Sequence, residues 1–276
     1  MTHRLKRLLV PVHDAAAVDA ALPRACRLAA RLGSVVEVLY LRGIAVDRVL
    51  LGEGAPPAAL RHRLDEAEDA EDRRMAAARA AVDLHSGAHP AVTVRWRVAA
   101  GAETAALARH GRLCDLIVLP RHRGNSTTVH GPQFNAALFE TGRPVLLLPE
   151  TGDALPVSRV AVAWDGSVQA GRALADALPL LAGAESVTVL RVSDDPQDAE
   201  AGEVAAYLAD HGIAAAARRL APAGSVADTL RAEVAAAGID LLVMGAYGHS
   251  RLRERVLGGV SRSLLSSAPV PILLAH

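Results

Sequence analysis

The sequence predicts an α/β protein that consists of two tandem domains. Short apolar runs of strand type alternate along the chain with stretches whose apolar residues recur at helical spacing. The same order of elements occurs twice. Of the 276 residues, 51% are hydrophobic but only 3% are aromatic, so the core must come mainly from alanine, leucine and valine. Helices that pack on strands of β-branched residues are typical of this fold class.

The first half contains five expected strands and four expected helices. The strands are 8–12, 35–41, 92–98, 116–119 and 144–148, and the helices are 15–32, 58–84, 102–111 and 134–141. Gly33 follows the first helix and is expected to end it. The long helix 58–84 carries a run of charged residues that we expect to line a solvated face: Asp65, Glu66, Glu68, Asp69, Glu71, Asp72, Arg73 and Arg74.

The second half repeats this order after a polar segment, 151–156, which we interpret as a linker because it carries proline and glycine. Its expected strands are 160–163, 187–192, 214–220, 241–244 and 270–274. Its expected helices are 168–181, 200–211, 225–237 and 260–267, the third capped by Ser225. The domains are therefore expected at 1–150 and 156–276.

An internal duplication supports this division. Pro144 aligns with Pro271 at an offset of 127, within two matching strands that end the halves. The stretches 115–119 and 240–244 also match, at an offset of 125. Each half is thus one copy of a βαβ-type unit. Alternating strands and helices imply parallel strands joined by right-handed crossovers, as in doubly wound folds.

Composition excludes several classes of function. The 30 basic and 30 acidic residues give a net charge of +0, so we expect neither nucleic acid nor a membrane surface as partner. No apolar run approaches the roughly 20 residues of a membrane span. A basic start precedes 8–12, but that run is too short for a signal peptide and is interpreted as a strand. Cys26 and Cys114 are expected to be buried reduced thiols, which favours a cytoplasmic protein. None of the 11 histidines has metal-ligand spacing, so no metal site is expected.

The candidate ligand site lies in the second half. In an open parallel sheet, ligands bind beyond the carboxyl ends of the strands. Asp165 follows the first strand, Val192 ends the second, and a glycine stretch that starts at Gly245 follows the fourth. A carboxylate there can accept hydrogen bonds from ribose, a strand end can meet adenine, and a glycine loop can hold phosphates. The alternatives are that Asp165 is only a turn or capping residue and that the glycines form an ordinary βα turn.

The glycine stretch resembles the ATP-binding fingerprint of the universal stress proteins. That family's pattern is Gly-x2-Gly-x9-Gly-Ser/Thr, and this chain has Gly245-x2-Gly248-x9-Gly258. The segment 268–274 also resembles the family's last strand. The resemblance covers both halves and implies tandem doubly wound domains. Each would have a five-stranded parallel sheet flanked by helices.

The resemblance also implies a ligand and partners. The ligand would be ATP, or ADP or AMP, with magnesium as an option, in stress response or signalling. The two last strands would pair within the chain, and a homodimer stays open. The implied nucleotide-binding residues are Ala163, Asp165, Val192, Met244, Gly245, Gly248, His249, Ser250, Arg251, Gly258, Gly259, Val260 and Ser261.

Two departures from the family pattern limit this interpretation. Gly259 stands where the family has Ser or Thr, so the hydroxyl for a terminal phosphate is absent, although Ser261 lies two residues on. The first half lacks the fingerprint, because Pro120 replaces Gly245 in the alignment. Its domain is therefore expected to be degenerate and not to bind ATP. The other first-half substitutions are Arg123 for Gly248, Pro132 for Gly259 and His13 for Asp165.

Two further classes of function compete with nucleotide binding. One is a structural or interaction stress protein that binds no nucleotide, which Gly259 favours; the intact spacing of three glycines favours binding. The other is an enzyme. The chain has no P-loop and no Gly-x-Gly-x-x-Gly after a first strand, and no catalytic residues are indicated. Slow ATP hydrolysis is the most that we expect.

Overall fold

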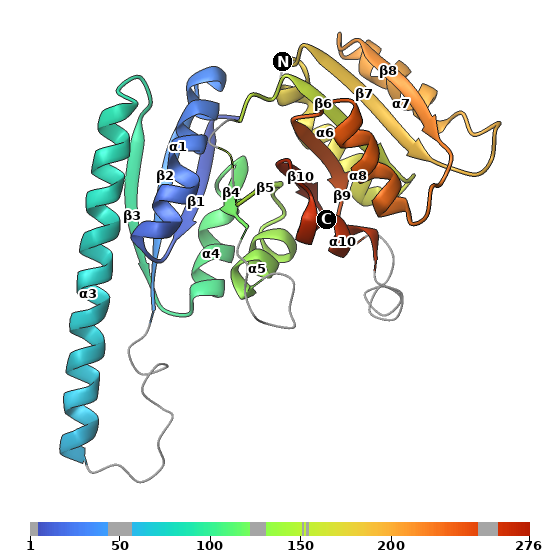
Figure 1. Ribbon diagram of the computed structural model, residues 1–276. Coiled ribbons are helices and arrows are strands. Elements are labelled where there is room, and N and C mark those ends of the chain that lie inside the picture. Colours follow the sequence, from blue (N-terminus) through green and yellow to red (C-terminus); the bar gives the residue numbers. More distant parts are fainter. Residues whose placement is uncertain (1–4, 44–56, 122–130, 151, 153–154, 248–258) are drawn as a thin grey trace. The chain divides into compact units, whose positions relative to one another are not determined.

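The computed structural model describes residues 5–43, 57–121, 131–150, 152, 155–247 and 259–276 (Figure 1). The chain forms two compact units. The N-terminal unit comprises Lys6–Pro120 and Pro132–Thr141. The C-terminal unit comprises Gly142–His276 together with Met1–Leu5 and Arg121–Gly131. The expected domain boundaries near residues 150 and 156 follow the sequence repeat, whereas these units follow the packing.

The N-terminal unit contains a parallel sheet in the order β3-β2-β1-β4. Right-handed crossovers in this order place α1 and α3 on one face and α4 and α5 on the other. Helix α1 contacts α3, and α4 contacts α5. The elements are β1 (Arg7–Val12), α1 (Ala15–Leu32), β2 (Val35–Arg42), α3 (Pro57–Ala88), β3 (Val94–Ala100), α4 (Glu103–Gly111), β4 (Leu116–Pro120) and α5 (Pro132–Glu140).

The C-terminal unit contains strands in the order β5-β10-β9-β6-β7-β8. All neighbours are parallel except β5 and β10, which are antiparallel, with Leu147 opposite Ile272. The elements are β5 (Val145–Leu148), β6 (Arg159–Trp164), α6 (Val168–Leu181), β7 (Ser186–Val192), α7 (Glu200–Asp210), β8 (Ala215–Leu220), α8 (Val226–Ala236), β9 (Leu241–Gly245), α10 (Val260–Ser267) and β10 (Ile272–Ala275).

The α/β class is confirmed, and so is the pairing of the last strands of the two repeats. Strand β5 ends the first repeat in sequence but pairs with β10, the last strand of the second. The five strands of the second repeat, β10-β9-β6-β7-β8, are all parallel, as the resemblance implied, and the antiparallel pair is the join between the two repeats.

Local capping explains where α1 begins and ends and where α8 begins. The Asp14 carboxylate accepts a hydrogen bond from the Ala17 N–H, at 2.7 Å, at the start of α1. Gly33 ends that helix in the left-handed region, with φ 63°, as expected. The Ser225 side chain accepts from the Asp228 N–H at the start of α8, at 3.1 Å, so the predicted cap is confirmed.

One prediction about the long helix is wrong. Glu71 of α3 is only 3% exposed, although we expected it on a solvated face. Its carboxylate accepts hydrogen bonds from the Tyr40 hydroxyl at 2.9 Å and from the Arg74 guanidinium at 2.6 Å. A buried charge is tolerated when it is paired and hydrogen-bonded in this way. Helical periodicity alone does not reveal such a partner, because Tyr40 lies on β2.

Both cysteines are buried and neither forms a disulfide, as expected. Burial raises the pKa of the Cys26 thiol to about 11. This thiol therefore stays protonated at neutral pH and behaves as a small apolar side chain. None of the helices in the described part of the chain combines the length and apolar character that a membrane crossing requires.

The duplication predicted at 115–119 and 240–244 has a structural counterpart in each unit. Asp115 accepts hydrogen bonds from the backbone N–H groups of Lys6 and Arg7, at 2.7 and 2.9 Å. Asp240 accepts from the N–H groups of Ser158 and Arg159, at 2.9 and 3.0 Å. Each carboxylate thus satisfies the N–H group just before the first strand of its own repeat and the first N–H group of that strand.

We expect Asp240→Ala to lower the free energy of unfolding by about 1–3 kcal/mol, because two backbone donors would lose their acceptor. Asp240→Asn keeps one acceptor oxygen and should lose less. Chemical denaturation followed by circular dichroism measures both. The control is Asp194→Ala, an exposed carboxylate in the same unit, which should change stability by no more than about 0.5 kcal/mol. Equal stability of Asp240→Ala and the control would contradict the capping role.

Candidate functional site

The candidate site lies at the carboxyl edge of the sheet in the C-terminal unit. Strands β6 and β9 are neighbours there, but the chain runs from β6 toward β7 on one side and from β9 toward β10 on the other. Such a switch point leaves a crevice beyond the strand ends. Ala163 of β6 and Met244 of β9 are paired in register and buried just below this edge. They therefore form the floor of the candidate site.

Gly245, the last residue of β9, is in very close contact with the start of α6. A Cβ atom added there would lie 2.5 Å from the Ala170 backbone nitrogen and 2.8 Å from the Gln169 carbonyl carbon. No side chain fits at that separation, so this position requires glycine. The atoms that approach Gly245 belong to a helix backbone, not to a phosphate. The first glycine of the fingerprint therefore has a packing role that the sequence did not reveal.

The segment after β9 turns sharply. The Ala246 N–H donates to the Ala275 carbonyl at 2.9 Å, and Tyr247 then adopts a left-handed conformation with φ 57°. The Tyr247 N–H donates to the Ser261 hydroxyl at 3.4 Å, a long hydrogen bond. Ser261 is only 6% exposed. Ser261 was the residue whose hydroxyl was considered as a replacement for the one missing at Gly259. That hydroxyl instead links Tyr247, just after β9, to α10.

His276 adds a second link at this edge. Its Nδ1 lies 3.0 Å from the Ala246 carbonyl oxygen. A carbonyl can only accept a hydrogen bond, so Nδ1 carries the proton. The His276 carbonyl in turn accepts from the Arg172 guanidinium of α6, at 2.8 Å. These contacts hold the ends of β9 and β10 against α6.

The N-cap of helix α10 is Gly259, which has no side chain. Within the described residues no side-chain cap is found there, so the N–H groups of its first turn receive no capping acceptor from residue 259. Val260 and Ser261 form that first turn. The predicted site residues Gly248, His249, Ser250, Arg251 and Gly258 lie outside the described residues.

Asp165 is exposed at the end of β6 and makes a tight turn. Its Oδ1 accepts a hydrogen bond from the Ser167 N–H at 3.0 Å. The cap of α6 is Ser167, whose hydroxyl accepts from the Ala170 N–H at 3.1 Å. Asp165 therefore forms a turn and is not the helix cap, and whether it also binds a ligand is not tested by this contact. Its exposed carboxylate remains at the edge where a ribose would be expected.

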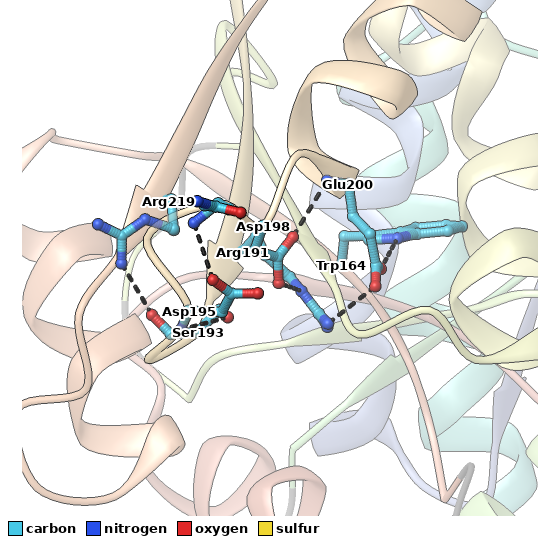
Figure 2. Close-up of polar contacts among 8 residues, drawn as sticks. Trp164, Arg191, Ser193, Asp195, Asp198, Glu200 and Arg219 are labelled. Carbon is cyan, nitrogen blue, oxygen red and sulfur yellow. Dashed lines mark hydrogen bonds and ion pairs between the residues drawn. The ribbon is translucent and has the colours of Figure 1, made fainter.

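A polar network next to Asp165 and Val192 was not predicted (Figure 2). The Trp164 indole N–H donates to Glu200 Oε2 at 2.9 Å, and Arg191 donates to Glu200 Oε1 at 3.0 Å. Arg191 also donates through Nε to Asp198 Oδ2 at 2.9 Å. Trp164 and Arg191 are paired in register on β6 and β7. One arginine thus joins two carboxylates from the segment that follows its own strand.

This network fixes the segment 193–199, which leaves the sheet at Val192. Asp198 Oδ1 accepts the Glu200 N–H at 3.0 Å, which satisfies a donor at the start of α7. The hydrogen bond from Arg191 is the main reason that the pKa of Asp198 lies below its usual value. The Arg219 guanidinium donates to the Ser193 carbonyl at 3.0 Å. The sequence carried a signal for this network, because the polar groups of Trp164 and Arg191 lie near the carboxyl ends of otherwise apolar strands.

The comparisons with known proteins agree with this architecture. A sequence model of the Universal stress protein family matches residues 4–133 and 156–276. A universal stress protein of Synechocystis sp. is 31% identical over 140 residues, which are 48% of this chain and 46% of that protein. The chain therefore spans about half the length of this relative.

Two solved structures share the fold over nearly the whole chain. A universal stress protein from Archaeoglobus fulgidus has a TM-score of 0.73 at 18% identity, covering 99% of this chain and 97% of its own. A protein of unknown function from Pseudomonas aeruginosa has a TM-score of 0.57 at 15% identity, covering 98% and 92%. The chain is thus a duplicated, doubly wound α/β protein whose second repeat has a topological switch point between β6 and β9. By the family match over both segments, the chain belongs to the universal stress protein family.

We expect Gly245→Ala to destabilise the protein by about 1–3 kcal/mol, because the new methyl group would overlap the backbone of α6. Thermal and urea denaturation measure the change. Gly171→Ala is a matched control in α6, since nothing lies within 4 Å of a Cβ added there. Replacing that helical glycine should instead stabilise by about 0.5–1 kcal/mol. If the two variants were equally stable, the close approach at Gly245 would not constrain the fold.

Proposed function

We propose that the C-terminal unit binds an adenine nucleotide (ATP, ADP or AMP) at the carboxyl edge of its sheet, and that the protein acts in stress response or signalling through this single site. The observation that carries the proposal is the convergence of three features at one switch point. Asp165 follows β6, Val192 ends β7, and Gly245 opens the fingerprint at the end of β9. The N-terminus of α10 follows that fingerprint.

The distribution of charge favours one orientation of the nucleotide. The exposed carboxylate of Asp165, at the end of β6, would repel phosphates but accept hydrogen bonds from ribose hydroxyls, whereas Asp198 and Glu200 are already paired with Arg191. The segment between Gly248 and Gly258 carries three arginines in the sequence. Phosphates would therefore lie toward the glycine loop and the start of α10, where backbone N–H groups favour anions.

Gly259 limits what the terminal phosphate can contribute. It supplies a backbone N–H but no hydroxyl, and Ser261 is already hydrogen-bonded to Tyr247. The proposed site therefore gains little from a third phosphate, with or without magnesium. We expect similar affinities for ATP and ADP. A stress protein without nucleotide remains the second candidate, and the missing hydroxyl at Gly259 is the observation that favours it.

The N-terminal repeat lacks the corresponding site in this proposal. Asp14, the acid nearest the position of Asp165, already caps α1 through Ala17. It also lies 3.3 Å from the His13 ring. Pro120 ends β4 where the second repeat has Gly245. The proposal therefore assigns one nucleotide to each chain.

Calorimetric titration of the purified chain with ATP, ADP and AMP tests the proposal. We expect one site per chain. Gly248→Arg, which copies the residue aligned in the first repeat, should abolish binding because the arginine fills the space of the phosphates. The matched control is the reverse change Arg123→Gly, which should leave the stoichiometry at one because Pro120 and Pro132 remain. A wild-type chain that binds none of these nucleotides would overturn the proposal and leave the structural alternative.

The role of Asp165 can be separated from its turn. We expect Asp165→Ala to weaken ATP binding by about 1–2 kcal/mol through lost ribose hydrogen bonds. Trp164 fluorescence, in a Trp96→Phe background, reports the titration from beside the site. Asp195→Ala is the matched control, because Asp195 makes the same kind of turn with the Gln197 N–H at 2.9 Å. If both variants lost stability but neither lost affinity, Asp165 would be a turn residue alone.

A further inference from the structure

Arg121 stands at the position in the first repeat where the second repeat begins its glycine loop. The Arg121 N–H donates to the Leu148 carbonyl at 2.9 Å, and the Ala246 N–H donates to the Ala275 carbonyl at the same distance. The two residues are therefore equivalent in the two repeats. Ala246 has a small side chain, whereas Arg121 carries a guanidinium group. Both lie in the C-terminal unit.

The Arg121 guanidinium reaches the end of α10. Its NH1 group donates to the carbonyl of Ala268, the C-cap of that helix, at 2.6 Å. A cation at this place is favourable because helix C-termini carry partial negative charge. The Nε and NH2 atoms are buried without a hydrogen-bond partner in the described part of the chain. Burial lowers the pKa of the group, and the negative charge of Glu150 opposes that effect.

This contact matters because α10 is too short to hold itself in place. Helices of eight residues have little stability of their own. The described contacts hold α10 at three points along its length. The Ser261 hydroxyl meets the Tyr247 N–H, and the Ser263 hydroxyl accepts from Arg231 of α8 at 3.0 Å. The third point is Arg121 at the C-terminal end.

We propose that Arg121 is a positioning residue for the nucleotide site: it fixes α10 so that the N–H groups of its first turn face the phosphates. The proposal rests on the nucleotide site proposed above. In this account the first repeat has lost its own glycine loop and uses the same position to hold the phosphate-binding helix of the second repeat. Arg121 does not touch the ligand, so its effect must pass through α10.

The test compares Arg121→Met, which keeps the length of the side chain without its charge, with Arg121→Lys, which keeps a charged donor. Hydrogen exchange of the ligand-free chain measures α10 directly. We expect exchange of the amides in 260–268 to rise about tenfold in Arg121→Met, with β6 and β7 unchanged, and to return most of the way in Arg121→Lys. Arg218→Met is the control, because the ion pair of Arg218 with Glu233 joins β8 to α8 and does not involve α10.

Calorimetry with adenosine, AMP and ATP then separates positioning from a general loss of structure. For Arg121→Met we expect the affinity for AMP and ATP to fall about 5- to 20-fold while the affinity for adenosine stays within about twofold. An equal loss for adenosine, or unchanged affinity for ATP, would overturn the proposal. If the wild-type chain bound no nucleotide, the proposed function would fail, and unchanged exchange in α10 would separately refute the contact's role.

Discussion

The close approach of α6 to the end of β9 is the constraint on which the candidate site depends. A Cβ atom at Gly245 would lie 2.5 Å from the Ala170 nitrogen, so backbone meets backbone at this point. The turn that carries Asp165 and Ser167 leads directly into α6, and Tyr247 follows two residues after Gly245. The contact between Gly245 and the backbone of α6 therefore sets the distance between the turn at Asp165 and the end of β9, and no side chain is needed for it. Any residue other than glycine would push the two apart.

The two repeats agree at the amino edge of their strands and differ at the carboxyl edge. At the amino edge both repeats use the same device, since Asp115 and Asp240 each accept two backbone N–H groups at the start of the first strand. At the carboxyl edge the repeats differ. Pro120 ends β4 in the first repeat, while Gly245 ends β9 in the second. Proline has no N–H and a fixed φ, whereas glycine has an N–H and the widest choice of φ. The two copies thus share the aspartate that caps the first strand, and they differ at the residue that ends the fourth strand.

Much of the fold could be predicted from the sequence because it depends on local patterns. Helical and strand periodicity located the elements, although β3 is Val94–Ala100 and not 92–98, and α3 extends to Ala88. Features that join distant elements could not be predicted. The burial of Glu71 depends on Tyr40 of another strand, and the bridge from Arg191 to Glu200 depends on how α7 returns to the sheet. Gly245 was singled out as a nucleotide-binding residue, which stays a prediction, and its close contact with α6 could not be inferred from spacing. The fingerprint residues between 248 and 258 stay a prediction.

The antiparallel pairing of β5 with β10 has consequences for assembly and for the site. Strand β10 has neighbours on both sides, β9 and β5, so a second chain could add there only by displacing β5. A homodimer would need a different surface. The same pairing brings the end of the first repeat beside the last helix of the second, because Leu148 ends β5 and α10 leads into β10. Arg121 is held by the Leu148 carbonyl and reaches Ala268 from there. Pairing the last strands within one chain is thus the condition that lets a residue of the first repeat act on the last helix of the second.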